Sequence, residues 1–131
     1  ALQATQGQLI TMDLKPPVND WPKDWPVKNI QFVQGDDRKL NLQQPIDALF
    51  LDGDHTQEAV TDELTRLAPW VRVGGKVILH DTWHDQFGPG IQTALRTFAR
   101  QYQLIWTDYP ISHGLAIVEM THAIPKTENP A

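Results

Sequence analysis

The sequence of 131 residues contains no cysteine, which excludes disulfide bonds and thiolate metal sites. No apolar run approaches the roughly twenty residues of a membrane-spanning helix, and no secretory leader is recognisable at the amino end. The 11 basic residues against 16 acidic ones give a net charge of −5, without the basic clusters that nucleic-acid phosphates require. We therefore expect a cytoplasmic protein that binds neither nucleic acid nor membrane.

Two apolar runs, 46–51 and 77–79, each end in acidic and imidazole side chains. These polar residues are Asp52, Asp54, His55, His80 and Asp81. Continuous apolar runs are typical of parallel strands that are buried on both faces between helices. Open sheets of this kind bind ligands beyond the carboxyl ends of their strands. The two strand ends are therefore predicted to form one polar site.

Periodicity predicts the other elements. Further strands are expected over 7–14, 30–34 and 76–79, with a late antiparallel pair at 104–106 and 115–118. An amphipathic helix is expected from Thr56 to about Val71, followed by a glycine turn, and a second helix is expected to begin at Pro89. The proline-rich segment 15–27 favours a surface loop. The strand, helix and strand from 46 to 79 predict two parallel neighbouring strands.

The order of the strand-end motifs resembles the later part of class I S-adenosylmethionine-dependent methyltransferases. The motifs are Asp13, Val33-Gln34-Gly35-Asp36, Leu51-Asp52-Gly53-Asp54-His55 and Gly74-Gly75 followed by His80-Asp81. The Asp-Gly-Asp-His box is similar to the branch near macrocin O-methyltransferase and cephalosporin hydroxylase. The resemblance covers about residues 7–120 and implies a three-layer Rossmann-like α/β fold, mostly parallel with an antiparallel carboxyl-terminal strand, in a partial domain over 1–120. The polar segment 121–131, which contains Pro125 and Pro130, is expected to be a flexible tail.

One motif of that family has no counterpart in this sequence. The family's first strand ends in a glycine-rich turn that lets the backbone approach the cofactor, and no Gly-x-Gly segment occurs here. We therefore expect a partial domain that lacks the first strand, which normally lies at the sheet centre. An uncovered strand edge is a template for pairing, so homodimerisation is also expected.

The resemblance implies S-adenosylmethionine as cofactor and assigns residues to it. Asp13 would accept hydrogen bonds from the ribose hydroxyls. Gly35, Asp36 and Asp37 would form the adenine side, with Asp36 accepting from the exocyclic amine, and Asp52 is also counted as cofactor-binding. The alternative for Asp13 is a solvated strand end, and the alternative for residues 35–37 is an ordinary aspartate-rich turn that needs no ligand.

Asp52, His80 and Asp81 are the predicted metal ligands. Carboxylate oxygens suit Mg²⁺ or another divalent cation, which would also orient a substrate hydroxyl pair. An acid often occupies the position of His80 in related metal-dependent enzymes, so a histidine there leaves a softer ion open. Two close carboxylates repel each other, so a cation or a basic partner is expected beside them. The alternative is that Asp54 or His55 caps the following helix and Asp81 caps a turn.

His55 and Asp52 are the predicted catalytic residues, with His55 as the base. An imidazole exchanges protons near neutral pH and would take the proton of an acceptor hydroxyl during methyl transfer. Its alternative is a purely structural hydrogen bond. The pocket for a small-molecule substrate is expected to be lined by Trp83, His84, Asp85 and His113.

The functional hypothesis is therefore O-methylation of a small molecule, assisted by a divalent cation. Two alternatives stay open at this point. One is a non-catalytic remnant of the fold that dimerises or binds a partner. The other is a metal-dependent hydrolase or hydroxylase that uses Asp52, His80 and Asp81 without a cofactor.

Overall fold

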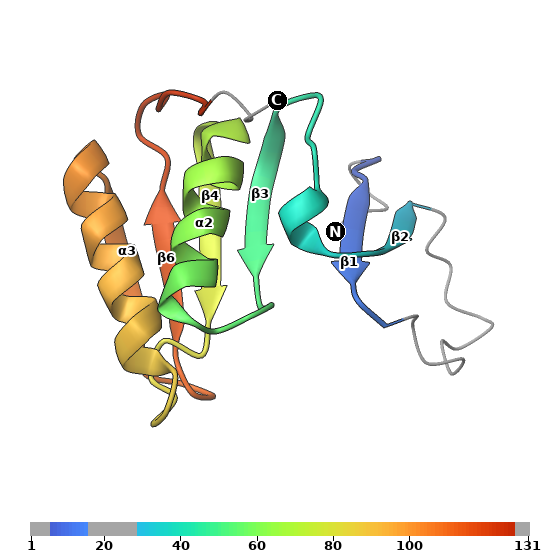
Figure 1. Cartoon of the computed structure of the whole chain (residues 1–131). Coiled ribbons are helices and arrows are strands. Elements are labelled where there is room, and N and C mark those ends of the chain that lie inside the picture. Colours follow the sequence, from blue (N-terminus) through green and yellow to red (C-terminus); the bar gives the residue numbers. More distant parts are fainter. Residues whose placement is uncertain (1–5, 16–28, 128–131) are drawn as a thin grey trace. The chain divides into compact units, whose positions relative to one another are not determined.

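The structure is a computed structural model that describes residues 6–15 and 29–127 (Figure 1). The chain divides into two compact units, Ala1–Asn41 and Leu42–Ala131. Among the described residues, no helix is long and apolar enough to cross a membrane. The predicted loop 15–27 lies, apart from Lys15, outside the described residues.

The first unit is built on two parallel strands. β1 (Leu9–Asp13) pairs with β2 (Ile30–Gln34) in a register that runs from Leu9↔Ile30 to Asp13↔Gln34. A short 3-10 helix, η1 (Asp37–Lys39), follows β2. The prediction for 30–34 is confirmed residue for residue, and the prediction for 7–14 is confirmed over its central five residues.

The second unit holds a four-stranded sheet in the order β3-β4-β6-β5. Its strands are β3 (Ile46–Leu51), β4 (Val71–His80), β5 (Ile105–Tyr109) and β6 (Leu115–Glu119). β3 and β4 are parallel neighbours, as predicted, and β6 is antiparallel to both β4 and β5. Three of the four strands therefore run in one direction, and the late antiparallel pair is confirmed.

Two helices, α2 and α3, cover one face of this sheet; in Figure 1, α2 lies in front of β4 and α3 lies beside β6. α2 (Gln57–Leu67) begins at Thr56, whose hydroxyl accepts a hydrogen bond from the Ala59 amide at 3.3 Å. α3 (Gly88–Tyr102) has Pro89 in its first turn. The core consists of apolar side chains from these helices and from alternate positions of β4 and β6, namely Leu64, Val77, Leu79, Leu95, Ala116 and Val118.

The predicted end of the first helix is wrong. α2 stops at Leu67 and passes into the 3-10 helix η2 (Ala68–Trp70), because Pro69 has no N–H with which to continue the helical hydrogen bonds. Residues 71–75 belong to β4 and do not form the predicted glycine turn. The register between β3 and β4 shifts there, at a bulge that contains Gly74 with φ +84. The strand therefore starts five residues earlier than predicted.

The prediction that 46–51 is buried on both faces is also wrong. Leu51 is buried against the helices, but Ala48 is exposed and Phe50 is 56% exposed. Alternate residues of a strand point to opposite faces, and the described helices of this unit cover one face only. The Rossmann-like α/β fold is confirmed, with α2 and α3 supplying one of its helical layers.

The segment after β6 packs, over part of its length, against the rest of the second unit. Ile124 is buried, and the Lys126 ammonium lies 3.6 Å from the centre of the Trp70 ring. Residues 128–131 lie outside the described residues. The division into a domain over 1–120 and a flexible tail over 121–131 stays a prediction.

Candidate functional site

The carboxyl ends of β3 and β4 lie side by side because the two strands are parallel and pair through Leu51↔Leu79. Asp52 comes directly after Leu51, and His80 comes directly after Leu79. The His80 Nδ1 lies 3.2 Å from Asp52 Oδ1. The same Nδ1 lies 3.2 Å from Asp81 Oδ1. One donor atom from each of these three residues falls within 4.8 Å of the others. The structure thus brings the predicted metal ligands together.

His55 completes this group from the segment that leads into α2. Its Nε2 lies 3.2 Å from Asp81 Oδ2 and 3.4 Å from Asp52 Oδ1. The atom is buried and has no partner in hydrogen-bonding geometry. We call Asp52, His55, His80 and Asp81 the Asp–His cluster. One nitrogen of each imidazole, His55 Nε2 and His80 Nδ1, lies within 3.4 Å of both carboxylates.

The cluster contains no permanent positive charge. Within the described part of the chain, no lysine or arginine nitrogen lies within 4.0 Å of the Asp52 or Asp81 carboxylates. Asp81 is also only 16% exposed, so water screens its charge poorly. The cation or basic partner expected beside these close carboxylates is therefore one of the two imidazoles or a bound ion.

The backbone turns sharply at Asp81. This residue has φ +58, in the left-handed region that aspartate tolerates better than most residues do. Its carbonyl accepts a hydrogen bond from the His84 amide at 3.0 Å, while its carboxylate faces the two imidazoles. The side chain therefore points into the cluster, and the backbone carbonyl closes the turn.

Asp54 lies outside the cluster and has a local structural role. Its Oδ1 accepts a hydrogen bond from the Thr56 amide at 2.9 Å. Thr56 itself caps α2, so the alternative in which His55 caps the helix is wrong. The acid of the Asp-Gly-Asp-His box that reaches the cluster is Asp52.

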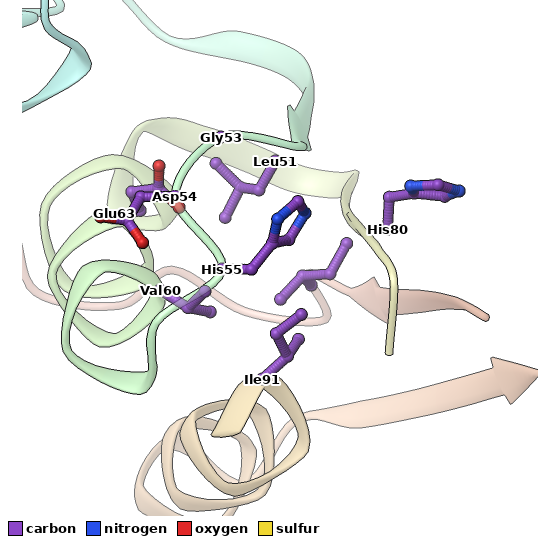
Figure 2. Close-up of a pocket in the computed structure, with 9 residues that line it drawn as sticks. Leu51, Gly53, Asp54, His55, Val60, Glu63, His80 and Ile91 are labelled. Atoms are coloured by element: carbon purple, nitrogen blue, oxygen red, sulfur yellow. The ribbon is translucent and has the colours of Figure 1, made fainter. Parts of the chain in front are cut away.

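A small cavity of about 10 Å³ lies beneath the cluster. Figure 2 shows the His55 ring between Leu51 and Ile91, with Glu63 on the α2 side of the cavity. This volume is close to the minimum for one water molecule. The cavity therefore cannot receive a substrate.

A larger groove of about 370 Å³ lies along the turn after β4 and the first turns of α3. Three of the four predicted substrate-pocket residues line it, namely Trp83, His84 and Asp85. His113 is not among its lining residues, but its ring centre lies 5.5 Å from that of His84. The groove also contains Arg96, whose guanidinium donates to the Gln92 side chain at 2.9 Å.

Two residues that support this edge were missed by the sequence analysis. Phe87 stacks on His55 at 5.7 Å between ring centres and on His84 at 5.0 Å. Asp108 accepts hydrogen bonds from the buried Thr82 hydroxyl at 2.8 Å and from the Trp83 indole N–H at 2.7 Å. No local pattern signals a contact that spans 26 residues. Only the return of β5 to the same sheet edge creates it.

The remaining predicted cofactor residues belong to the first unit, whereas Asp52 belongs to the second. Asp13 Oδ1 accepts a hydrogen bond from the Lys15 amide at 3.0 Å, and the Gly35 amide donates to the Asp13 carbonyl at 2.9 Å. Asp37 is the first residue of η1. Asp13, Gly35 and Asp37 therefore lie together at the carboxyl ends of β1 and β2.

Asp36 is already engaged within its own turn. Both of its oxygens accept hydrogen bonds from the Arg38 guanidinium, at 2.7 to 3.1 Å, and Oδ1 also accepts from the Arg38 amide at 3.0 Å. The side-chain hydrogen bonds are the main reason that the pKa of Asp36 falls from 3.8 to about 2. This turn satisfies the alternative interpretation, in which the acid needs no ligand.

Comparison with known families agrees with this architecture. A family model for a methyltransferase domain matches residues 1–82, which is more than half of the chain. This chain belongs to that family. The class I methyltransferase membership that the strand-end motifs implied is therefore confirmed.

Solved structures of methyltransferases share the fold. The SAH-bound methyltransferase PaMTH1 from Podospora anserina matches with a TM-score of 0.60 and 12% identity, over 90% of this chain and 62% of its own. The O-methyltransferase NovP matches with a TM-score of 0.55 and 26% identity, over 76% and 40%. MycE from the mycinamycin biosynthetic pathway, in complex with Mg, SAH and mycinamycin VI, matches with a TM-score of 0.59 and 20% identity, over 87% and 36%. The chain thus spans less than two thirds of the length of each.

Proposed function

We propose that this chain contributes to S-adenosylmethionine-dependent methyl transfer to a hydroxyl oxygen of a small molecule, assisted by a divalent cation. The observation that carries the proposal is the Asp–His cluster at the carboxyl ends of β3 and β4. Ligand sites of open α/β sheets lie at such edges. The family membership supplies the reaction class.

The donor atoms of the cluster fit a divalent cation. Asp52 and Asp81 supply negative charge without a lysine or arginine of the described chain within 4.0 Å, and His80 Nδ1 points at both carboxylates. These three residues would hold the ion. When bound there, the ion would polarise an acceptor hydroxyl and ease loss of its proton. MycE, whose structure contains Mg and SAH, supports the same assignment by analogy.

His55 is proposed as the group that receives the acceptor proton. When bound, S-adenosylmethionine would supply the methyl group to the acceptor oxygen, and its sulfur would keep the electron pair of the broken sulfur–carbon bond. The hydroxyl proton would pass to the His55 imidazole. A proton on this ring is stabilised by Asp52 and Asp81, whose oxygens lie 3.2 to 3.4 Å from Nε2.

Cofactor binding is proposed for Asp13, Gly35, Asp36 and Asp37 of the first unit and, separately, for Asp52 of the second. Asp13 is the strongest of these assignments, because only one of its oxygens accepts a described hydrogen bond. Asp36 shares both oxygens with Arg38 and has less capacity for an adenine amine. SAH in the structures of PaMTH1 and MycE supports this choice of cofactor.

Calorimetric titration of the 131-residue chain with SAH tests the proposal. We expect saturable binding that is lost in Asp13→Ala and kept in Asp62→Ala, a change of a surface acid that pairs with Arg66. Transfer of a labelled methyl group to a panel of small hydroxylated acceptors is then measured. Absence of SAH binding at millimolar ligand, or binding without transfer to any acceptor, would overturn the proposal.

A further inference from the structure

The Asp–His cluster differs from an all-oxygen cation site in one chemical respect. Of the three residues whose donor atoms lie within 4.8 Å of one another, one offers an imidazole nitrogen, His80 Nδ1. A second imidazole nitrogen, His55 Nε2, faces the same two carboxylates. The cluster therefore draws its donors equally from imidazole and carboxylate side chains.

This mixture matters because divalent ions differ in their preferred ligands. Mg²⁺ favours octahedral oxygen coordination and keeps several of its waters, whereas imidazole suits Zn²⁺, Fe²⁺, Co²⁺ and Ni²⁺. Zinc and non-haem iron sites combine imidazole with carboxylate ligands, as this cluster does, although those sites commonly use two imidazoles and one carboxylate. A nitrogen at the centre of the cluster therefore works against Mg²⁺.

The position of His80 makes its nitrogen hard to avoid. Nδ1 lies 3.2 Å from Asp52 Oδ1 and 3.2 Å from Asp81 Oδ1, so an ion held by both carboxylates also meets His80. The residue sits at the last position of β4, paired with Leu115 of β6, which fixes its backbone. The 30% exposure of its side chain leaves the site open to ions from solvent.

We infer that the Asp–His cluster selects a borderline transition-metal ion, of the Zn²⁺, Co²⁺ or Fe²⁺ type, over Mg²⁺, and that His80 is the residue that sets this preference. The inference deepens the proposed function, since it names the class of cation. It rests on the cation site and not on methyl transfer itself. Its test therefore uses metal binding as the readout.

The experiment titrates the metal-free 131-residue chain separately with Zn²⁺, Co²⁺ and Mg²⁺ by calorimetry, and follows Co²⁺ by its visible absorption. We expect one site per chain, with Zn²⁺ and Co²⁺ bound about 100-fold or more tightly than Mg²⁺. His80→Asn should lower Zn²⁺ affinity about tenfold or more and change the Co²⁺ spectrum. His80→Asp, which supplies an oxygen ligand in place of the nitrogen, should reduce the difference in affinity between Zn²⁺ and Mg²⁺.

His122→Asn is the matched control. His122 is an exposed histidine of the same unit whose Nε2 lies 2.8 Å from the Tyr102 carbonyl oxygen. Its replacement should leave the affinities and the Co²⁺ spectrum unchanged. Circular dichroism checks that each variant is folded. If His80→Asn does not fold, the metal affinities of His80→Asp alone test the inference.

Three results would overturn the inference. They are Mg²⁺ binding as tight as Zn²⁺ binding, no binding of any ion, and an equal loss of affinity in the His122 and His80 variants. A chain that binds SAH and transfers methyl groups but shows one of these results keeps the proposed methyl transfer and loses the inference, and with no ion bound it also loses the proposed cation assistance. A chain that shows the expected metal preference but binds no SAH keeps the inference and loses the proposed function.

Discussion

Two acidic regions of this molecule balance their negative charge in different ways. In the turn after β2, Asp36 pairs with Arg38, two residues further along, through a guanidinium that is 74% exposed. At the carboxyl ends of β3 and β4, Asp52 and Asp81 form their described ion pairs with imidazoles alone, and the cluster is drawn from distant parts of the sequence. The first region is complete within one turn of chain. The second depends on the fold and contains no permanent positive charge of its own.

The difference separates a structural acid from a candidate functional one. An exposed ion pair such as Asp36–Arg38 contributes little to stability and needs nothing from outside. The carboxylates of the Asp–His cluster are held close together by β-sheet pairing and by the strained turn at Asp81. Residues in such conformations persist where the surrounding structure over-determines them, often at functional sites. The following predictions test how far this contrast extends.

The largest effect on stability is expected from Gly114→Val, at the close contact of Gly114 with the turn that follows Asp81. Gly114 has φ +98, and a Cβ there would lie 2.4 Å from the Thr82 hydroxyl and 2.5 Å from the Trp83 amide. Backbone strain and overpacking together predict a loss of about 3 kcal/mol or more in the free energy of unfolding, measured by chemical denaturation. Gly35→Ala, at a position with ordinary φ and a 3.4 Å approach to a flexible methionine, should cost less than about 1 kcal/mol. Equal losses of stability at the two glycines would show that the close contact of Gly114 with Thr82 and Trp83 does not require a glycine.

The next effect comes from filling the cluster with an ion. A metal ion present at about 100 times its dissociation constant should raise the free energy of unfolding by about 2.7 kcal/mol. Asp81→Asn should remove this gain, because asparagine tolerates the left-handed backbone at this position but supplies no charge. The comparison is made by thermal or chemical unfolding with the ion and with a chelator. An undiminished gain in Asp81→Asn would place the ion elsewhere.

A smaller effect is expected from the buried hydroxyl of Thr82. Thr82→Val removes the donor to Asp108 and leaves a half-buried carboxylate oxygen without that partner, which costs about 1 to 3 kcal/mol. Thr93→Val removes a hydroxyl that donates to a carbonyl on the exposed face of α3, and should change stability by less than about 0.5 kcal/mol. Urea denaturation of both variants gives the difference. A cost at Thr93 as large as at Thr82 would contradict a stabilising role for the hydrogen bond between the buried Thr82 hydroxyl and Asp108.

The parts that could be predicted from sequence are those that depend on local pattern. The apolar run 46–51 defines β3 residue for residue, and the crossover rule for a strand, helix and strand makes β4 its parallel neighbour. From these two features follows the meeting of Asp52 with His80 and Asp81. The strand-end motifs were likewise sufficient to identify the family.

The parts that could not be predicted depend on contacts between distant segments. Pro69 ends α2 early, but the strand character of 71–75 arises from pairing with the edge of β3 and from hydrogen bonds between Gly74, Gly75 and Met120. The exposure of Phe50 depends on which faces of the sheet the helices cover. The burial of His55 Nε2 depends on the cluster that the fold builds around it. None of these has a period or motif in the sequence.

The smallest effect concerns the self-contained turn and has no measurable consequence for stability. The pKa of Asp36 lies at about 2 rather than 3.8, chiefly because of its hydrogen bonds to Arg38. A lowered pKa in the folded chain favours folding above pH 3.8, and that contribution is lost as the pH falls toward 2. Because the Arg38 guanidinium is 74% exposed and water screens the pair, we expect the effect in the titration of Asp36 alone. Arg38→Gln should move the midpoint, followed by the carboxyl carbon resonance of Asp36, upward toward 3.8. Arg96→Gln, which removes a guanidinium bonded to Gln92, should leave it unchanged. A midpoint that stays near 2 without Arg38 would mean that this acid, like those of the cluster, owes its charge balance to more distant parts of the fold.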